Sequence, residues 1–153
     1  MEYRIPQYVT VVRRVVPRQD VCRVIVHRGV TTIEEDAFLD WANLREVVFE
    51  PGSRLEMVGT YAFAGTALES FTAPRSLRRI DAGAFANCRN LREAMLNEGL
   101  QYIGESAFYG SGVETVYIPS TLREMPKGAL FRCGSLKRVE VAEGCKVDVK
   151  YCV

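Results

Sequence analysis

The side chains best suited to catalysis are few and scattered along the chain. The single histidine, His27, precedes Arg28 and Gly29 at the end of a predicted strand. A general base needs a group to act on within hydrogen-bond reach, and the sequence shows no phosphate, metal or dinucleotide motif around it. A lone histidine in this setting is usually a surface residue. We therefore expect no catalytic site, no cofactor and no enzymatic activity.

Five cysteines are the next candidates, for metal or redox chemistry. Their number is odd and their spacings match no zinc motif. Cys88 and Cys133 occupy the same place in two related segments that are two rungs apart, so stacked strands would hold their thiols roughly 10 Å apart. That distance excludes a disulfide, and we expect two reduced core thiols. Cys145 and Cys152 could approach each other near the C-terminus, and a bridge between them stays open.

A third candidate is a group of basic residues that could bind an anion or phosphate groups. Its members are Arg75, Arg78, Arg79, Arg89 and Arg92. Three acidic residues, Glu69, Asp81 and Glu93, lie among them, which is typical of a solvated surface. The net charge of +1 creates no overall field for nucleic acid or membrane, and we expect neither as a partner.

An internal repeat must position all of these residues. Phenylalanine, once replaced by leucine, recurs at intervals of 22 to 25 residues, at Phe38, Phe63, Phe85, Phe108 and Leu130. Each unit opens with an aliphatic residue, at Val21, Leu44, Leu68, Leu91, Val113 and Leu136. A fixed period in this range is the signature of a solenoid, in which each coil contacts its neighbours.

The pattern within a unit predicts its local structure. The opening residues alternate as a short parallel strand, which places positions 1, 4 and 6 in the core and positions 3, 5 and 7 on an outer, concave face. The Ala-Phe segment is short and is followed by Gly or Asn, so a helical turn or 3-10 piece is expected on the convex side. The phenylalanines should stack into a spine through the core.

The repeat also sets the predicted boundaries. Residues 1–20 do not match it and are expected to form an N-terminal cap, with a strand within residues 9–16. Five full repeats follow, at 21–43, 44–67, 68–90, 91–112 and 113–135. Residues 136–153 are either a partial repeat or a C-terminal cap.

Two segments carry a resemblance to a known family. Residues 113–122 read VETVYIPSTL and residues 100–108 read LQYIGESAF. Together with the Cys88 and Cys133 positions they resemble the BspA-like leucine-rich repeat, L-x-x-V-x-I-P-x-x-L-x-x-I-G-x-x-A-F-x-x-C, although Asn97 replaces the proline in one unit. The resemblance covers residues 21 to about 147. It implies a leucine-rich repeat solenoid, in a family that includes surface proteins implicated in adhesion to host proteins.

Position 5 of successive units forms a row across the outer face, at Ile25, Val48, Thr72, Met95, Tyr117 and Glu140. An apolar stripe rimmed by polar residues favours a protein partner, although strand propensity alone could explain the same residue types. We expect contact area from Ile25, Val48, Met95 and Tyr117. Polar specificity would come from Glu46, Glu50, Glu93, Asn97 and Arg138.

Position 2 alternates in charge along the predicted stack, which indicates a structural ladder. Its members are Arg45, Glu69, Arg92, Glu114 and Lys137. Neighbouring rungs would bring opposite charges together, and a slip in register would oppose like charges.

Two functions follow from these observations. The first is a non-enzymatic scaffold that binds a protein partner, of unknown identity, on the concave face. The second is a structural segment of a larger surface adhesin or repeat array, with weak homodimers through the edge at 136–153. The N-terminus shows no signal peptide, so the cytoplasm is slightly favoured unless the chain is cut from a longer one.

Overall fold

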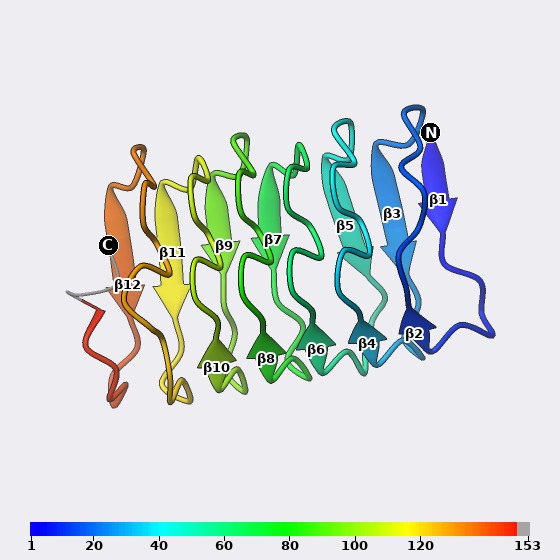
Figure 1. Cartoon of the computed structure of the whole chain (residues 1–153). Coiled ribbons are helices and arrows are strands. Elements are labelled where there is room, and N and C mark those ends of the chain that lie inside the picture. The colour runs from blue at the N-terminus through cyan, green and yellow to red at the C-terminus, as the bar shows by residue number, and fades with distance from the viewer. Residues whose placement is uncertain (150–153) are drawn as a thin grey trace.

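The computed structural model describes residues 1–149 and confirms a solenoid of parallel strands. Most coils contribute one strand to each of two rows, which run side by side along the molecule (Figure 1). The long-strand row contains β1 (Glu2–Arg4), β3 (Arg23–Val26), β5 (Glu46–Phe49), β7 (Ser70–Thr72), β9 (Glu93–Met95), β11 (Thr115–Ile118) and β12 (Arg138–Val141). The short-strand row contains β2 (Val11–Val12), β4 (Thr32–Ile33), β6 (Met57–Val58), β8 (Arg79–Ile80) and β10 (Tyr102–Ile103).

The predicted core positions are buried in almost every coil. The opening residues from Val21 to Val113 are fully buried, and Leu136 is partly buried. Positions 4 and 6 follow the same rule, except in the second and last coils. In the second coil Val47 and Phe49 are half-buried, which is the first sign that one wall of this coil is open.

A ladder of phenylalanine rings fills the convex side of the core, as predicted. Phe38, Phe63, Phe85 and Phe108 stack nearly parallel, with ring centroids 5.2 to 5.5 Å apart. All four rings are fully buried. Burial of each contributes about 1.5–3 kcal/mol to folding, and the ladder joins every coil from the first to the fourth.

The convex segments are turns, and the helical or 3-10 pieces expected there are not confirmed. Two places before and two places after each phenylalanine position the backbone is left-handed, at Asp36, Asp40, Tyr61, Gly65, Gly83, Asn87, Ser106, Gly110, Gly128 and Arg132. A right-handed helix cannot include such residues. The N–H groups instead alternate between the local turn and the next coil, as when Phe63 donates to the Ala84 carbonyl at 2.8 Å.

Residues 1–20 form an outer coil of their own. The strand β1 pairs with β3, and β2 pairs with β4. The predicted strand within residues 9–16 is limited to Val11–Val12. Trp41, which lies three residues after Phe38, fills the end of the core and donates its Nε1–H to the Val15 carbonyl at 3.2 Å.

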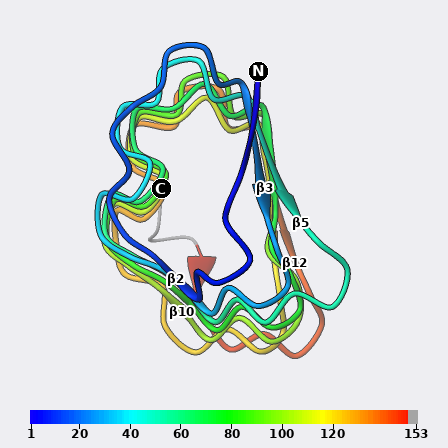
Figure 2. The ribbon, with the colours of Figure 1, turned by 90° about the vertical axis from the view of Figure 1, so that its right-hand side faces the viewer.

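The two rows differ in one respect. The short strands form one continuous sheet, β2-β4-β6-β8-β10, whereas the long strands form two, β1-β3-β5 and β7-β9-β11-β12. The two sheets still meet at one bond, from the Glu69 N–H to the Arg45 carbonyl at 3.1 Å. Beyond that point the chain after β5 swings away from the other coils (Figure 2).

Candidate interaction surface

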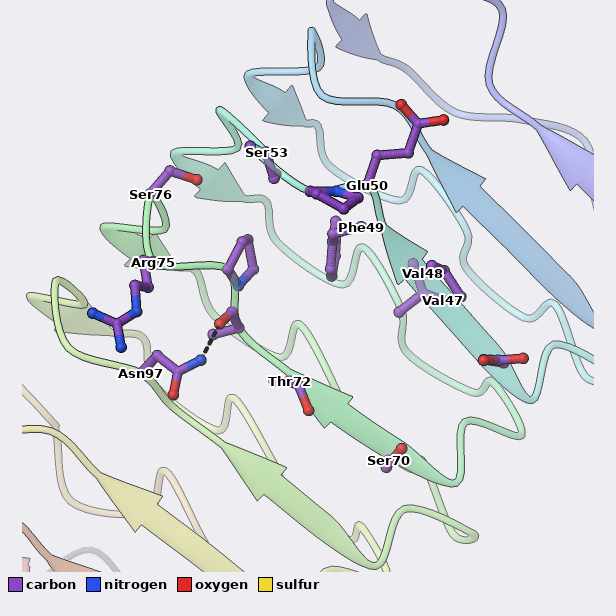
Figure 3. Close-up of a pocket in the computed structure, with 15 residues that line it drawn as sticks. Val47, Val48, Phe49, Glu50, Ser53, Ser70, Thr72, Arg75, Ser76 and Asn97 are labelled. Carbon is purple, nitrogen blue, oxygen red and sulfur yellow. Dashed lines mark hydrogen bonds between the residues drawn. The ribbon is translucent and has the colours of Figure 1, made fainter.

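The break between β5 and β7 opens a cleft of about 650 Å³ (Figure 3). Its floor and walls come from both strands and from the loops that follow them. The lining residues are Glu46, Val47, Val48, Phe49, Glu50, Pro51, Gly52, Ser53, Ser70, Thr72, Ala73, Pro74, Arg75, Ser76 and Asn97. The cleft therefore mixes an apolar floor with hydroxyl, amide and charged groups at its rim.

Two local features separate the strands. Between the first and second repeats the Glu50 N–H donates to the Val26 carbonyl at 3.0 Å. One coil further on the equivalent residue is Pro74, which has no N–H to donate to the Phe49 carbonyl. In addition, the Phe49 ring packs edge-on against Phe71, with centroids 6.0 Å apart. Two large rings thus stand side by side where other coils place aliphatic residues.

The polar groups at the rim are unevenly satisfied. The Asn97 amide donates to the Ala73 carbonyl at 2.6 Å. Glu50 accepts from the Arg28 N–H at 3.4 Å. The Ser76 hydroxyl is buried and has no hydrogen-bond partner, and the Arg75 guanidinium forms no ion pair within residues 1–149. The rim on the β7 side therefore carries two donor groups that are unpaired within the described residues, the Arg75 guanidinium and the Ser76 hydroxyl.

The predicted apolar row is exposed for most of its length but not at its first member. Val48, Met95 and Tyr117 are half-buried. Ile25 is 6% exposed, which corrects the prediction that its side chain faces solvent. In the strand register Ile25 has Arg4 of the N-terminal coil on one side and Val48 on the other. The aliphatic part of an arginine side chain covers apolar surface well.

The predicted polar residues fall into two groups. Glu46, Glu50 and Asn97 line the cleft. Glu93 and Arg138 lie instead on the strands that flank Tyr117, to either side of β11. The negative charge of Glu140, the burial of the ring and the charge of Glu93 raise the pKa of Tyr117. A smaller hollow of about 270 Å³ beside Tyr117 also reaches Asn97, which connects the two groups.

The charge ladder closes over part of its predicted length. Glu114 binds Lys137 at 2.6 Å and Arg92 at 2.9 Å. The hydrogen bond and positive charge of Lys137, and to a smaller extent those of Arg92, hold the pKa of Glu114 below its ordinary value. Arg45 and Glu69 form no ion pair in the described residues, and no ion pair there crosses from the second coil to the third.

His27 is buried, at 3% exposed, which corrects the prediction of a surface histidine. Its Nδ1 accepts the Gly29 N–H at 3.1 Å, and its Nε2 lies 2.8 Å from the Val9 carbonyl. A nitrogen that accepts leaves the other to donate, so the ring joins the N-terminal coil to the first repeat. Both nitrogens are occupied, and the role is structural.

The cysteines behave as predicted where the structure describes them. Cys88 and Cys133 are free and buried. Their thiols donate to the carbonyls of Phe63 and Phe108, at 3.1 and 3.0 Å. Burial raises the pKa of Cys88 to about 11, so its thiol is unreactive. Whether Cys145 pairs with Cys152 was left open, and Cys152 lies outside the described residues.

The basic group considered as an anion site does not form one site. Arg79 pairs with Asp81, and Arg92 pairs with Glu114. Arg78 donates to the Arg75 carbonyl at 2.8 Å. Within residues 1–149 no group of histidine, cysteine, aspartate and glutamate side chains could hold a metal ion.

The cleft itself was not predicted from the sequence, and Phe49, Pro74 and Ser76 were missed as parts of a site, while Arg75 was considered only as a member of the basic group. Three signals pointed to it. The unit from Leu44 is 24 residues long, the turn around Pro51–Gly52 is longer than in the other units, and a proline after the next strand coincides with the large ring of Phe49.

The geometry defines a leucine-rich repeat solenoid with an open face on its long strands. The chain belongs to the BspA type leucine rich repeat family, whose model matches six copies over residues 19–137. Proteins of this kind are typically non-enzymatic repeat scaffolds and commonly bind other proteins. No curated protein matches the sequence. Within residues 1–149 no helix has the length and hydrophobicity that a membrane span requires.

Solved structures show the same fold. The pneumococcal vaccine antigen PcpA is 24% identical, with a TM-score of 0.83 over 95% of this chain and 41% of that one. A leucine-rich repeat protein from Eubacterium ventriosum is 25% identical, with a TM-score of 0.75 over 82% of this chain and 33% of that one. A leucine rich cell surface protein from Faecalibacterium prausnitzii is 19% identical, with a TM-score of 0.64 over 92% and 47%. The chain thus spans less than half the length of each.

Proposed function

We propose that this chain is a non-enzymatic scaffold that binds a protein partner on its long-strand row. One observation carries the proposal: half-exposed Val48, Met95 and Tyr117 lie on this row next to a cleft of about 650 Å³. Apolar and aromatic side chains beside a polar rim are typical of protein interfaces. Glu93, Asn97 and Arg138 supply the polar contacts around Tyr117.

The comparisons support a binding role of this kind. Two of the similar structures are described as a vaccine antigen and a cell surface protein, and both descriptions suit a protein that meets other molecules. Net charge of +1 argues against nucleic acid or an anionic membrane as the partner.

The test is capture of a partner from an extract by three proteins. They are the wild type, the double variant Met95→Glu/Tyr117→Glu, and Phe131→Glu as a control on the convex side, where Phe131 is 50% exposed. The wild type and the control should retain the same protein at high salt, because apolar contacts are not screened. The double variant should lose it while its circular dichroism spectrum stays unchanged. Equal capture by all three, or by none, would contradict the proposal.

A second candidate is a structural segment of a larger surface adhesin or repeat array. It is favoured by the position of β12 at the end of its sheet, where Val141 is 42% exposed. This role predicts self-association through residues 136–153. Sedimentation should then show dimers that Val141→Lys abolishes and Phe131→Lys does not.

A further inference from the structure

We propose that the cleft between β5 and β7 binds an extended peptide segment of the partner, whose main chain pairs with the free edge of β5 and whose acidic side chain meets Arg75. The inference rests on the proposed function, because it assigns a chemistry to the partner of the same surface. It goes further by naming the binding mode, the addition of a strand to a sheet edge.

The free edge follows from the alternation of a parallel ladder. Each strand residue directs its N–H and C=O to one neighbour, and the next residue directs them to the other. Glu50 and Glu46 donate to coil 1, to the carbonyls of Val26 and Cys22. The main-chain groups of Val47 and Phe49 therefore face the cleft, where no ladder joins β5 to β7.

Unpaired main-chain groups at a sheet edge are a template for another strand. Most edges lie at the ends of a solenoid, but this one lies between the second and third repeats. Pro74 cannot satisfy the Phe49 carbonyl, because it has no N–H. An inserted peptide supplies the donors and acceptors that β7 does not, and its side chains can rest on Val48 and Pro51, which line the same cleft.

The rim on the β7 side sets the preferred charge. Arg75 is exposed and has no ion pair among the described residues, and Ser76 offers a buried hydroxyl without a partner. In Figure 3 Arg75 lies beside Asn97 at the same end of the cleft. An exposed guanidinium favours a carboxylate, which it can bind through two parallel N–H donors. On the opposite wall Glu46 is already bound to Arg23 at 3.1 Å, so the acidic group belongs at the Arg75 end.

The experiment selects binders from a displayed library of random linear peptides, with the whole chain as the target. The enriched sequences should share an Asp or Glu at one position. Arg75→Gln should weaken a selected synthetic peptide at least about tenfold, because a charge-assisted hydrogen bond is lost. Arg54→Gln is the matched control, since Arg54 is exposed in the neighbouring loop but does not line the cleft. It should leave the affinity unchanged.

The main-chain pairing has its own test. N-methyl groups placed one at a time along the peptide should abolish binding at alternate residues and be tolerated between them. Peptides without an acidic residue, peptides indifferent to Arg75→Gln, or uniform tolerance of N-methylation would each overturn the inference, as would the absence of any enriched peptide. A cleft that binds a small molecule rather than a peptide would give this last outcome, with no enriched peptide.

The two proposals fail in different ways. Peptides or a captured partner that depend on Met95 and Tyr117 but not on Arg75 would overturn the cleft as the site and leave the proposed function standing. If neither Arg75→Gln nor Met95→Glu/Tyr117→Glu weakens any binder, both proposals are wrong. Circular dichroism of each variant separates lost binding from lost folding.

Discussion

The two strand rows differ at one boundary between coils. Between the second and third coils the short strands β6 and β8 pair normally, and Phe63 stacks on Phe85 with centroids 5.5 Å apart. On the long-strand row at the same boundary, β5 and β7 do not pair. One side of the solenoid is continuous while the other is open.

The difference shows which contacts fix the spacing of the coils. Buried rings, two-residue strands and inter-coil bonds of the convex turns repeat at every boundary from the first coil to the fourth. They are sufficient to hold the stack in register, since it survives a break in the other row. The long-strand row is therefore free to vary from coil to coil, and a binding cleft can form there without loss of the fold.

Amide hydrogen exchange should show the largest contrast. The Phe49 N–H faces the cleft, whereas the Val26 N–H lies in the paired edge between β3 and β5. Exchange of a paired core amide requires extensive unfolding, so Phe49 should exchange at least about a thousandfold faster than Val26. Comparable protection of the two amides in an NMR experiment would mean that the long-strand row is closed in solution.

Removing one ring from the continuous side should cause the largest loss of stability. Phe85 is fully buried and contacts Phe63, Phe71 and Phe108. Phe85→Ala should lower the free energy of unfolding by about 3–5 kcal/mol. The control is Phe49→Ala at the cleft, where the ring is half-buried and the loss should be about half as large. Urea unfolding of both variants measures the difference, and equal losses would contradict the assignment of the spacing to the convex side.

A smaller loss is expected from crowding the convex turns. A methyl group on Gly112, four residues after Phe108, would overlap the Arg89 carbonyl oxygen of the preceding coil, while one on Gly134, four residues after Leu130, meets nothing within 4 Å. Gly112→Ala should destabilise the protein by about 1–3 kcal/mol, as overpacking does. Gly134→Ala should be nearly neutral in the same thermal or urea unfolding assay. A neutral Gly112→Ala would mean that the coils can move apart on this side.

The continuous side could be predicted from the sequence, and the break could not. The phenylalanine period alone placed Phe38, Phe63, Phe85 and Phe108 in one stack, because a repeat forces equivalent residues into equivalent positions. A break is a departure from the repeat and depends on pairs of residues. Proline alone does not cause it, since Pro119 occupies the same place as Pro74 and yet β9 and β11 pair.

The other errors have the same origin. Ile25 and His27 were both expected on the outer face, but residues 1–20, which the repeat does not describe, supply their neighbours Arg4 and Val9. The helical turns were expected from segment length. Left-handed residues such as Tyr61 prevent them, and their sequence signal, a glycine two places from the phenylalanine, appears in some coils and not in others.

The smallest effect should come from the charge ladder, which closes where strands pair and is open at the break. Glu114→Gln removes the bonds to Arg92 and Lys137, whereas Glu69→Gln, at the same position beside the break, removes no ion pair found in residues 1–149. Exposed pairs of this kind contribute little and are screened by salt.

The folded-state pKa of Glu114 lies below its unfolded value. Its contribution to stability is therefore present at pH values above the unfolded pKa and is lost as the pH falls through the folded pKa. Urea midpoints should therefore separate Glu114→Gln from wild type at neutral pH and low salt, and converge in acid or high salt. Glu69→Gln should match the wild type throughout, and an equal response of the two variants would show that the ladder does not distinguish the paired coils from the open boundary.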